Sequence, residues 1–159
     1  MSTNRIFITT VAICIFAVGI VFLHTAAVAE QAQYGTPKEA RAMLVKVISA
    51  LKADKEKALD MFNKGVGGFK DRDLQPFCAQ VTDAKIVATI EPRLLGTDVK
   101  KLQDSTGKRF GVEIMRGAVE GRIAEVSYLF PRPGETIPHP KVSYVTRIGD
   151  LVCGVGYYE

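Results

Sequence analysis

The sequence of 159 residues predicts an α+β domain: a five-stranded antiparallel sheet with a long N-terminal helix and short helices packed on it. Three observations lead to this prediction. Apolar residues after residue 36 recur with the spacing of a helix, those near the C-terminus alternate with the period of a strand, and the strand-like runs have short connections. Helices followed by closely connected strands are typical of this fold class.

Residues 1–29 have the pattern of an export signal. Arg5 supplies a positive charge, residues 6–23 are almost wholly apolar, and Ala27 and Ala29 supply small residues where a signal peptidase cuts. We expect cleavage after Ala29, leaving one domain of residues 30–159 that is periplasmic or secreted. The apolar run of 18 residues is also at the lower limit for spanning a bilayer, so an uncleaved N-terminal anchor is the alternative.

The composition indicates a folded globular domain. Hydrophobic residues make up 47% of the chain and charged residues 24%, which is enough apolar material for a core. The formal net charge of +4 is spread along the chain. Because no basic run is interleaved with aromatic residues, we expect no nucleic-acid partner.

The helical region begins at Thr36, whose side chain can cap the amide of Glu39 while Pro37 occupies the first helical position. An apolar stripe then runs to Leu51, which predicts one long helix with a buried face. Asp54 can cap a second, short helix that ends before the glycines at 65–68.

Two short β-type runs at 77–81 and 86–90 flank a turn-forming segment and predict a hairpin. The connection at 92–111 is longer than loops usually run without helical turns, and residues 114–119 form a brief helical stretch.

Three further strands, at 123–130, 142–148 and 151–158, form a meander. We expect residues 135–140 to be an exposed loop, since proline cannot join an interior ladder. A tight turn at Gly149 and Asp150 joins the last two strands.

Cleavage of the signal leaves two cysteines, Cys78 and Cys153, in an oxidising compartment, which favours one disulfide. Each lies in an apolar strand-like run, so a pair of inert buried thiols is equally compatible with the pattern. A metal site is not expected, because the cysteines lack metal-ligand spacing and His139 is the single histidine after residue 29.

Seven short motifs follow one another along the chain: GGF at 67–69, IEP at 90–92, LGTD at 95–98, DSTGK at 104–108, EVSYLF at 125–130, PKVSYV at 140–145 and CGVGYY at 153–158. In this order and spacing, they resemble a single-Cache domain, the PAS-like extracytoplasmic sensor family. The resemblance covers essentially all of residues 30–159.

The resemblance implies a PAS-like sheet with a small-molecule pocket between its concave face and the helical segment after the hairpin. It also implies that the first strand lies beside the last, which would make Cys78 and Cys153 neighbours and a disulfide possible. Members of the family often carry a His-Pro pair where this chain has Glu91 and Pro92. Any contact that this histidine makes with the ligand in family members is therefore absent from this chain. The identity of the ligand does not carry over from those members.

The candidate ligand-binding residues are Tyr128, Phe130, Lys141 and Tyr144. We expect the three aromatic residues to share one face of two adjacent strands and to wall the pocket, although Phe130 also fits a plain core position. The Lys141 ammonium at the pocket mouth would hold a carboxylate; the alternative is a solvated lysine at a strand end. Arg116 and Arg132 are weaker candidates of the same kind.

Catalysis is not expected. His139 lies between two prolines, with nothing nearby in sequence to orient it as a general base, and no nucleotide or cofactor motif is present. We therefore expect a stand-alone exported domain that binds a small organic ligand, with a short carboxylate as the favoured class. Without an output segment of its own, it would present the ligand to a membrane receptor or kinase. The alternative is a homodimerising structural protein with a filled cleft.

Overall fold

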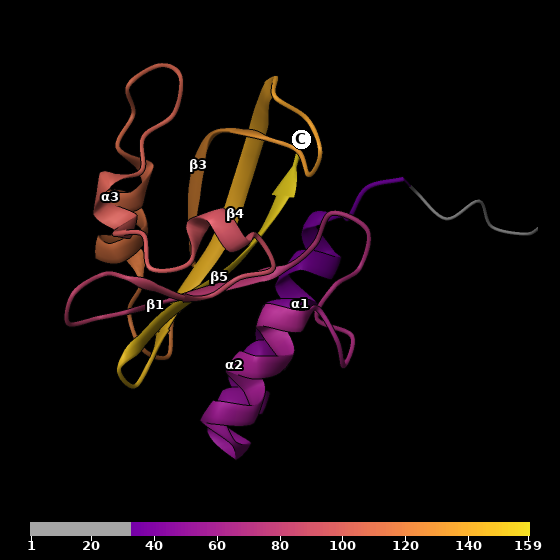
Figure 1. The fold of residues 1–159 in the computed structure, drawn as a ribbon, viewed down its shortest axis with the longest axis vertical. Coiled ribbons are helices and arrows are strands. Elements are labelled where there is room, and N and C mark those ends of the chain that lie inside the picture. Colours follow the sequence, from indigo (N-terminus) through magenta and orange to yellow (C-terminus); the bar gives the residue numbers. More distant parts are fainter. Residues whose placement is uncertain (1–32) are drawn as a thin grey trace, which may run out of the picture. The chain divides into compact units, whose positions relative to one another are not determined.

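The computed structural model describes residues 33–159, so the predicted export signal and its cleavage site lie outside the described residues. Within them, a five-stranded antiparallel sheet carries helices on both faces (Figure 1), which confirms the predicted fold class. The elements in chain order are α1 (Pro37–Ala53), α2 (Lys55–Lys64), β1 (Pro76–Gln80), β2 (Ile86–Ala88), η1 (Pro92–Leu94), η2 (Val99–Lys101), α3 (Phe110–Gly117), β3 (Ala124–Pro131), β4 (Pro138–Ile148) and β5 (Leu151–Tyr158).

The first two helices begin and end where the sequence predicts. The Thr36 hydroxyl accepts a hydrogen bond from the Glu39 amide, and the Glu39 carboxylate accepts one from the Thr36 amide. The Asp54 side chain caps α2 by accepting from the Lys57 amide. Gly65 ends α2 with φ 64°, a left-handed conformation that suits glycine.

The sheet has the order β2-β1-β5-β4-β3, so the first strand lies beside the last. One face packs against α1 and α2 through a core that includes Leu44, Val47 and Phe62. The other face packs against η2 and α3 through a second core that includes Phe110 and Ile114. The sheet therefore separates two apolar layers, and its strand register decides which layer each side chain enters.

The expectation of an exposed loop at 135–140 is wrong at its C-terminal end. β4 begins at Pro138, and Pro138 and Pro140 pair with Pro131 and Leu129 of β3. Tyr158, the last residue of β5, pairs with Lys141, so this start of β4 has a strand on one side only. Proline is tolerated there because no second ladder needs its missing amide.

The third helix begins earlier than the sequence indicates, at Phe110. Gly111, in its first turn, packs so closely on η2 that a Cβ there would lie 1.7 Å from the Val99 carbonyl oxygen. The start of α3 is therefore set by contact with a neighbouring element, which apolar periodicity does not report.

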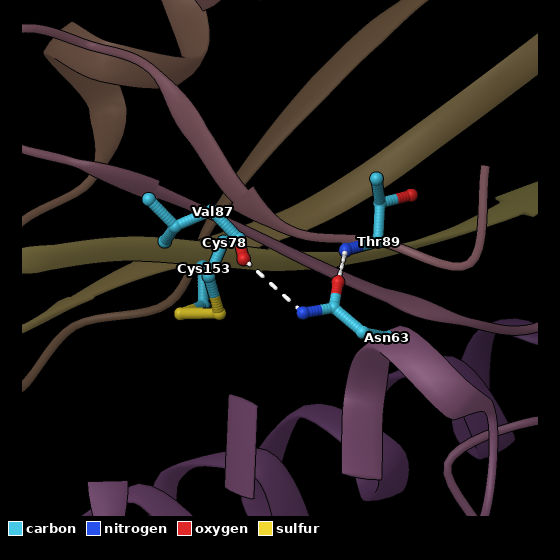
Figure 2. Close-up of a disulfide and its surroundings, with 5 residues drawn as sticks. All are labelled: Asn63, Cys78, Val87, Thr89 and Cys153. Atoms are coloured by element: carbon cyan, nitrogen blue, oxygen red, sulfur yellow. Dashed lines mark hydrogen bonds between the residues drawn. A yellow bond between two sulfur atoms is a disulfide. The ribbon is translucent and has the colours of Figure 1, made fainter. Parts of the chain in front are cut away.

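Side chains pair with both free edges of the sheet. At the β2 edge, Asn63 donates to the Val87 carbonyl (3.3 Å) and accepts from the Thr89 amide (2.9 Å), as Figure 2 shows. At the β3 edge, the Lys108 ammonium donates to the Ser127 carbonyl and Asp104 accepts from the Leu129 amide. These contacts occupy backbone groups that could otherwise pair with another chain.

We expect Asn63→Ala to lower the free energy of unfolding by about 1–3 kcal/mol, because it leaves the buried Thr89 amide without its acceptor. Asn63→Asp keeps that acceptor and should lose less. Urea denaturation measures both changes, with the exposed neighbour Lys64→Ala as the control. A loss for Asn63→Ala no larger than that of the control would contradict the assigned role.

Candidate functional site

A cavity of about 60 Å³ lies between the sheet and the segment from η1 to α3, where the sequence resemblance places a pocket. Its apolar walls come from β1, β2, β3 and that segment, and its polar groups come mainly from β4, β3 and the end of β2. The apolar lining includes Phe77, Ile86, Leu94, Val99, Leu102, Phe110, Ile114 and Phe130; the polar side chains are those of Gln75, Thr89, Glu91, Tyr128, Lys141 and Ser143.

Two glycines of β5 make room for the side chains that shape the cavity. A Cβ on Gly156 would lie 2.5 Å from Lys141 Cε, and one on Gly154 would lie 2.6 Å from Phe77 Cζ. Lys141 and Phe77 come from the strands on either side of β5. Phe77 is paired with Gly154, whereas Lys141 is paired with Tyr158 and reaches diagonally over Gly156. The alternation of glycines in CGVGYY is therefore explained by close approach of neighbouring side chains.

The Lys141 ammonium is held among aromatic groups. Its Nζ donates to the Tyr158 hydroxyl (3.2 Å) and lies 4.4 Å from the Tyr158 ring centroid and 5.2 Å from that of Phe130. No carboxylate of residues 33–159 forms an ion pair with it. Desolvation lowers the pKa of Lys141 to about 8, against a weaker opposing influence of Asp73 and Glu91.

Tyr158 completes the support of this ammonium. Its hydroxyl accepts from Lys141 of β4 and donates to the Pro131 carbonyl oxygen of β3 (2.5 Å), so its donor and acceptor roles are both fixed. Burial raises the pKa of Tyr158 well above its usual value, which keeps the phenol neutral.

Tyr128 forms the adjoining wall. Its hydroxyl is 2.8 Å from Ser143 Oγ, and its ring stacks on Phe110 with centroids 4.1 Å apart. Burial raises the pKa of Tyr128 to about 12, despite the hydrogen bond with Ser143. The Phe130 ring meets both of these rings edge-on at 6.1 Å. Three of the four candidate ligand-binding residues, Tyr128, Phe130 and Lys141, thus lie along one cavity.

The expectation that Tyr144 shares this face is wrong. Tyr144 pairs with Glu125, whereas Tyr128 pairs with Lys141, so the side chains of Tyr128 and Tyr144 leave the sheet on opposite faces. Tyr144 lies in the core that packs against α1 and α2. Its ring is 5.6 Å from the Tyr157 ring and 5.9 Å from the Arg41 guanidinium.

The two arginine candidates do not line the cavity. Arg116 is exposed on α3, and Arg132 stacks between the rings of Tyr34 (4.1 Å) and Tyr158 (5.1 Å). Sequence reasoning named Glu91 only as a departure from the His-Pro pair of the family and not as a lining residue, and it missed Tyr158 beside Lys141. For Tyr158 a signal existed: the tight turn at Gly149 and Asp150 fixes the register that places it opposite Lys141.

Cys78 and Cys153 form the predicted disulfide on the face of the sheet that packs against α1 and α2 (Figure 2). They are directly paired residues of β1 and β5, with Cα atoms 4.1 Å apart and both side chains fully buried. Their strand neighbours are Phe77, which lines the cavity, and Gly154, on which the Phe77 ring packs, so the disulfide fixes the two strands behind the cavity.

The described part of the chain contains neither a metal-binding cluster nor a membrane-spanning helix. Across residues 33–159, no three His, Cys, Asp or Glu side chains gather in a cluster that could hold a metal ion. None of the helices in the same range combines the length and hydrophobicity needed to cross a bilayer.

Comparison with solved structures identifies the fold. A methyl-accepting chemotaxis protein from Vibrio parahaemolyticus RIMD 2210633 matches with a TM-score of 0.61 and 18% identity, over 76% of this chain and 86% of that one. A periplasmic sensor domain of a chemotaxis protein matches with a TM-score of 0.56 and 24% identity, over 76% and 88%. A Cache chemosensory domain described for its recognition of carboxylic acids matches with a TM-score of 0.55 and 21% identity, over 76% and 86%.

At these identities the solved structures establish the fold alone. Comparison with curated proteins finds no match. The family model described as Single Cache domain 2 matches residues 27–158, which span both cores, the cavity and the disulfide. The chain therefore belongs to the single Cache domain 2 family, a family of sensory domains that bind small molecules.

Proposed function

We propose that this chain is an exported sensor domain whose cavity binds a short organic acid through Lys141, without catalysis. The observation that carries the proposal is the Lys141 ammonium at the cavity wall, which has aromatic rings and one phenol around it but no carboxylate partner within residues 33–159. A cation in such surroundings is stabilised by an anion.

The size of the cavity limits the ligand. Pockets for drug-sized molecules measure roughly 300–1,000 Å³, whereas this cavity holds about 60 Å³. A ligand of a few non-hydrogen atoms fits such a space, which favours acids of two to four carbons. The carboxylic acid recognition described for one structural neighbour supports the same class of ligand.

The disulfide and the predicted export signal support a location outside the cytoplasm, because structural disulfides form and persist in oxidising compartments. There the domain would present its ligand state to a membrane receptor or kinase. The lined cavity favours ligand binding over the alternative of a homodimerising structural protein with a filled cleft.

Thermal unfolding in the presence of acetate, propanoate and butanoate tests the proposal. A ligand at 100 times its dissociation constant should stabilise the domain by about 2.7 kcal/mol. Propylamine and propanol, which match propanoate in size, are the controls and should give no stabilisation. Equal responses to the acid, the amine and the alcohol, or no response to any acid, would refute the proposed ligand class.

A further inference from the structure

A second charged group, Glu91, faces the same cavity as Lys141. It lies between β2 and η1, and its side chain is 25% exposed. The Glu91 amide donates to the Thr89 hydroxyl (3.2 Å), and the Thr89 amide donates to Asn63 of α2. The backbone at Glu91 is therefore held in place by α2.

The charges of Glu91 and Lys141 do not neutralise each other. No ion pair joins them, and Glu91 instead pairs at 3.5 Å with Arg93, whose side chain is 67% exposed. Such an exposed pair is screened by solvent and contributes little. Glu91 nevertheless raises the pKa of Lys141 through space, so its field reaches the ammonium.

A third group strengthens this negative field. Asp73 is buried, its Oδ1 accepts from the Gly35 amide (2.6 Å), and its Oδ2 has no hydrogen-bond partner within the described part of the chain. Asp73 also raises the pKa of Lys141, although it does not line the cavity. Among the side chains that line the cavity, Lys141 is thus the positive group and Glu91 the negative one.

We infer that Glu91 makes the cavity selective for a short acid that also carries an ammonium group, that is, a small amino acid, with its carboxylate on Lys141 and its ammonium toward Glu91. This inference rests on the proposed function and adds the ligand class. A simple carboxylate would neutralise Lys141 but would also face the like charge of Glu91, whereas a zwitterion satisfies both groups.

Calorimetric titration with propanoate, lactate and alanine tests the inference, because the three share a three-carbon chain and differ at the second carbon. The native domain should bind alanine at least tenfold more tightly than propanoate or lactate. Glu91→Gln preserves the shape of the side chain and should reduce this preference to less than threefold, mainly by weakening alanine. Glu120→Gln, an exposed site outside the cavity, should leave it unchanged.

The ratio of the affinities for alanine and propanoate distinguishes a change in selectivity from a loss of folded protein, because partial unfolding lowers both affinities alike. Glu91→Ala, verified as folded by circular dichroism, should lose the preference as Glu91→Gln does. Equal or tighter binding of propanoate or lactate by the native domain overturns the inference but leaves the proposed acid site standing, as does an unchanged preference in Glu91→Gln. Absence of binding for all three acids overturns the proposed function itself.

Discussion

Lys141→Met is expected to weaken binding of a short organic acid by about 30- to 150-fold, the equivalent of roughly 2–3 kcal/mol for a charge-assisted contact. Methionine keeps an unbranched stem across Gly156, so the cavity wall should persist. The variant should unfold at the same or a higher temperature, because it removes a desolvated charge from the contacts with Phe130 and Tyr158. Calorimetric titration at pH 7 measures the affinity.

The pH dependence of binding identifies the ammonium as the responsible group. The pKa of Lys141 is about 8 in the unliganded domain, and a bound carboxylate raises it. Affinity should therefore change little between about pH 6 and 7 and fall as the pH rises through 8 and above, and Lys141→Met should lose this decline. An affinity that does not fall between pH 7 and about 9.5, or a variant that binds as tightly as the native domain, would contradict the assignment.

The lowered pKa of Lys141 also affects stability. Whereas the affinity for the acid falls as the pH rises, the stability of the unliganded domain should increase. Between about 8 and the usual value of 10.5, the unfolded chain binds a proton at Lys141 that the unliganded folded domain does not. The contribution of Lys141 to the free energy of unfolding therefore rises with pH in this window.

Among the changes considered for this domain, removal of the Cys78–Cys153 disulfide should cause the largest loss in the free energy of unfolding. The bridge joins residues 75 positions apart, and the chain-entropy relation for a loop of this length gives about 4.5 kcal/mol. The double variant Cys78→Ala/Cys153→Ala should lose stability of this order, since β1 and β5 would be held only by their ladder and packing. Urea denaturation of the variant and of the native domain, with and without reductant, measures the loss.

Reduced native domain and the double variant should unfold at similar urea concentrations, whereas reductant should not affect the variant. A loss below about 1 kcal/mol, under the usual range for native disulfides, would show that the bridge adds little to the sheet. Because Phe77 and Gly154 adjoin the two cysteines, we also expect weaker ligand binding by the reduced form.

Whether the position of a candidate residue can be predicted from the sequence depends on how the register of its strand is set. β4 and β5 are joined at the tight turn of Gly149 and Asp150, so the pairing of Lys141 with Tyr158 follows from the turn. β3 and β4 are joined by a longer, proline-rich loop, which does not fix their register. The prediction that Tyr128 and Tyr144 share a face assumed a register that differs by one residue from the observed one. One residue of register reverses the face of every side chain on a strand.

The sequence alone determined the two N-terminal helices, with their caps at Thr36 and Asp54, and the five strands apart from the start of β4, because capping and periodicity are local properties. Only the tertiary structure decided which side chains meet. It brought Glu91 to the cavity that Lys141 lines, set the start of α3 through Gly111, and placed Tyr144 behind the sheet. These relations depend on contacts between distant segments, and their geometry is fixed by packing across the sheet, which no local pattern encodes.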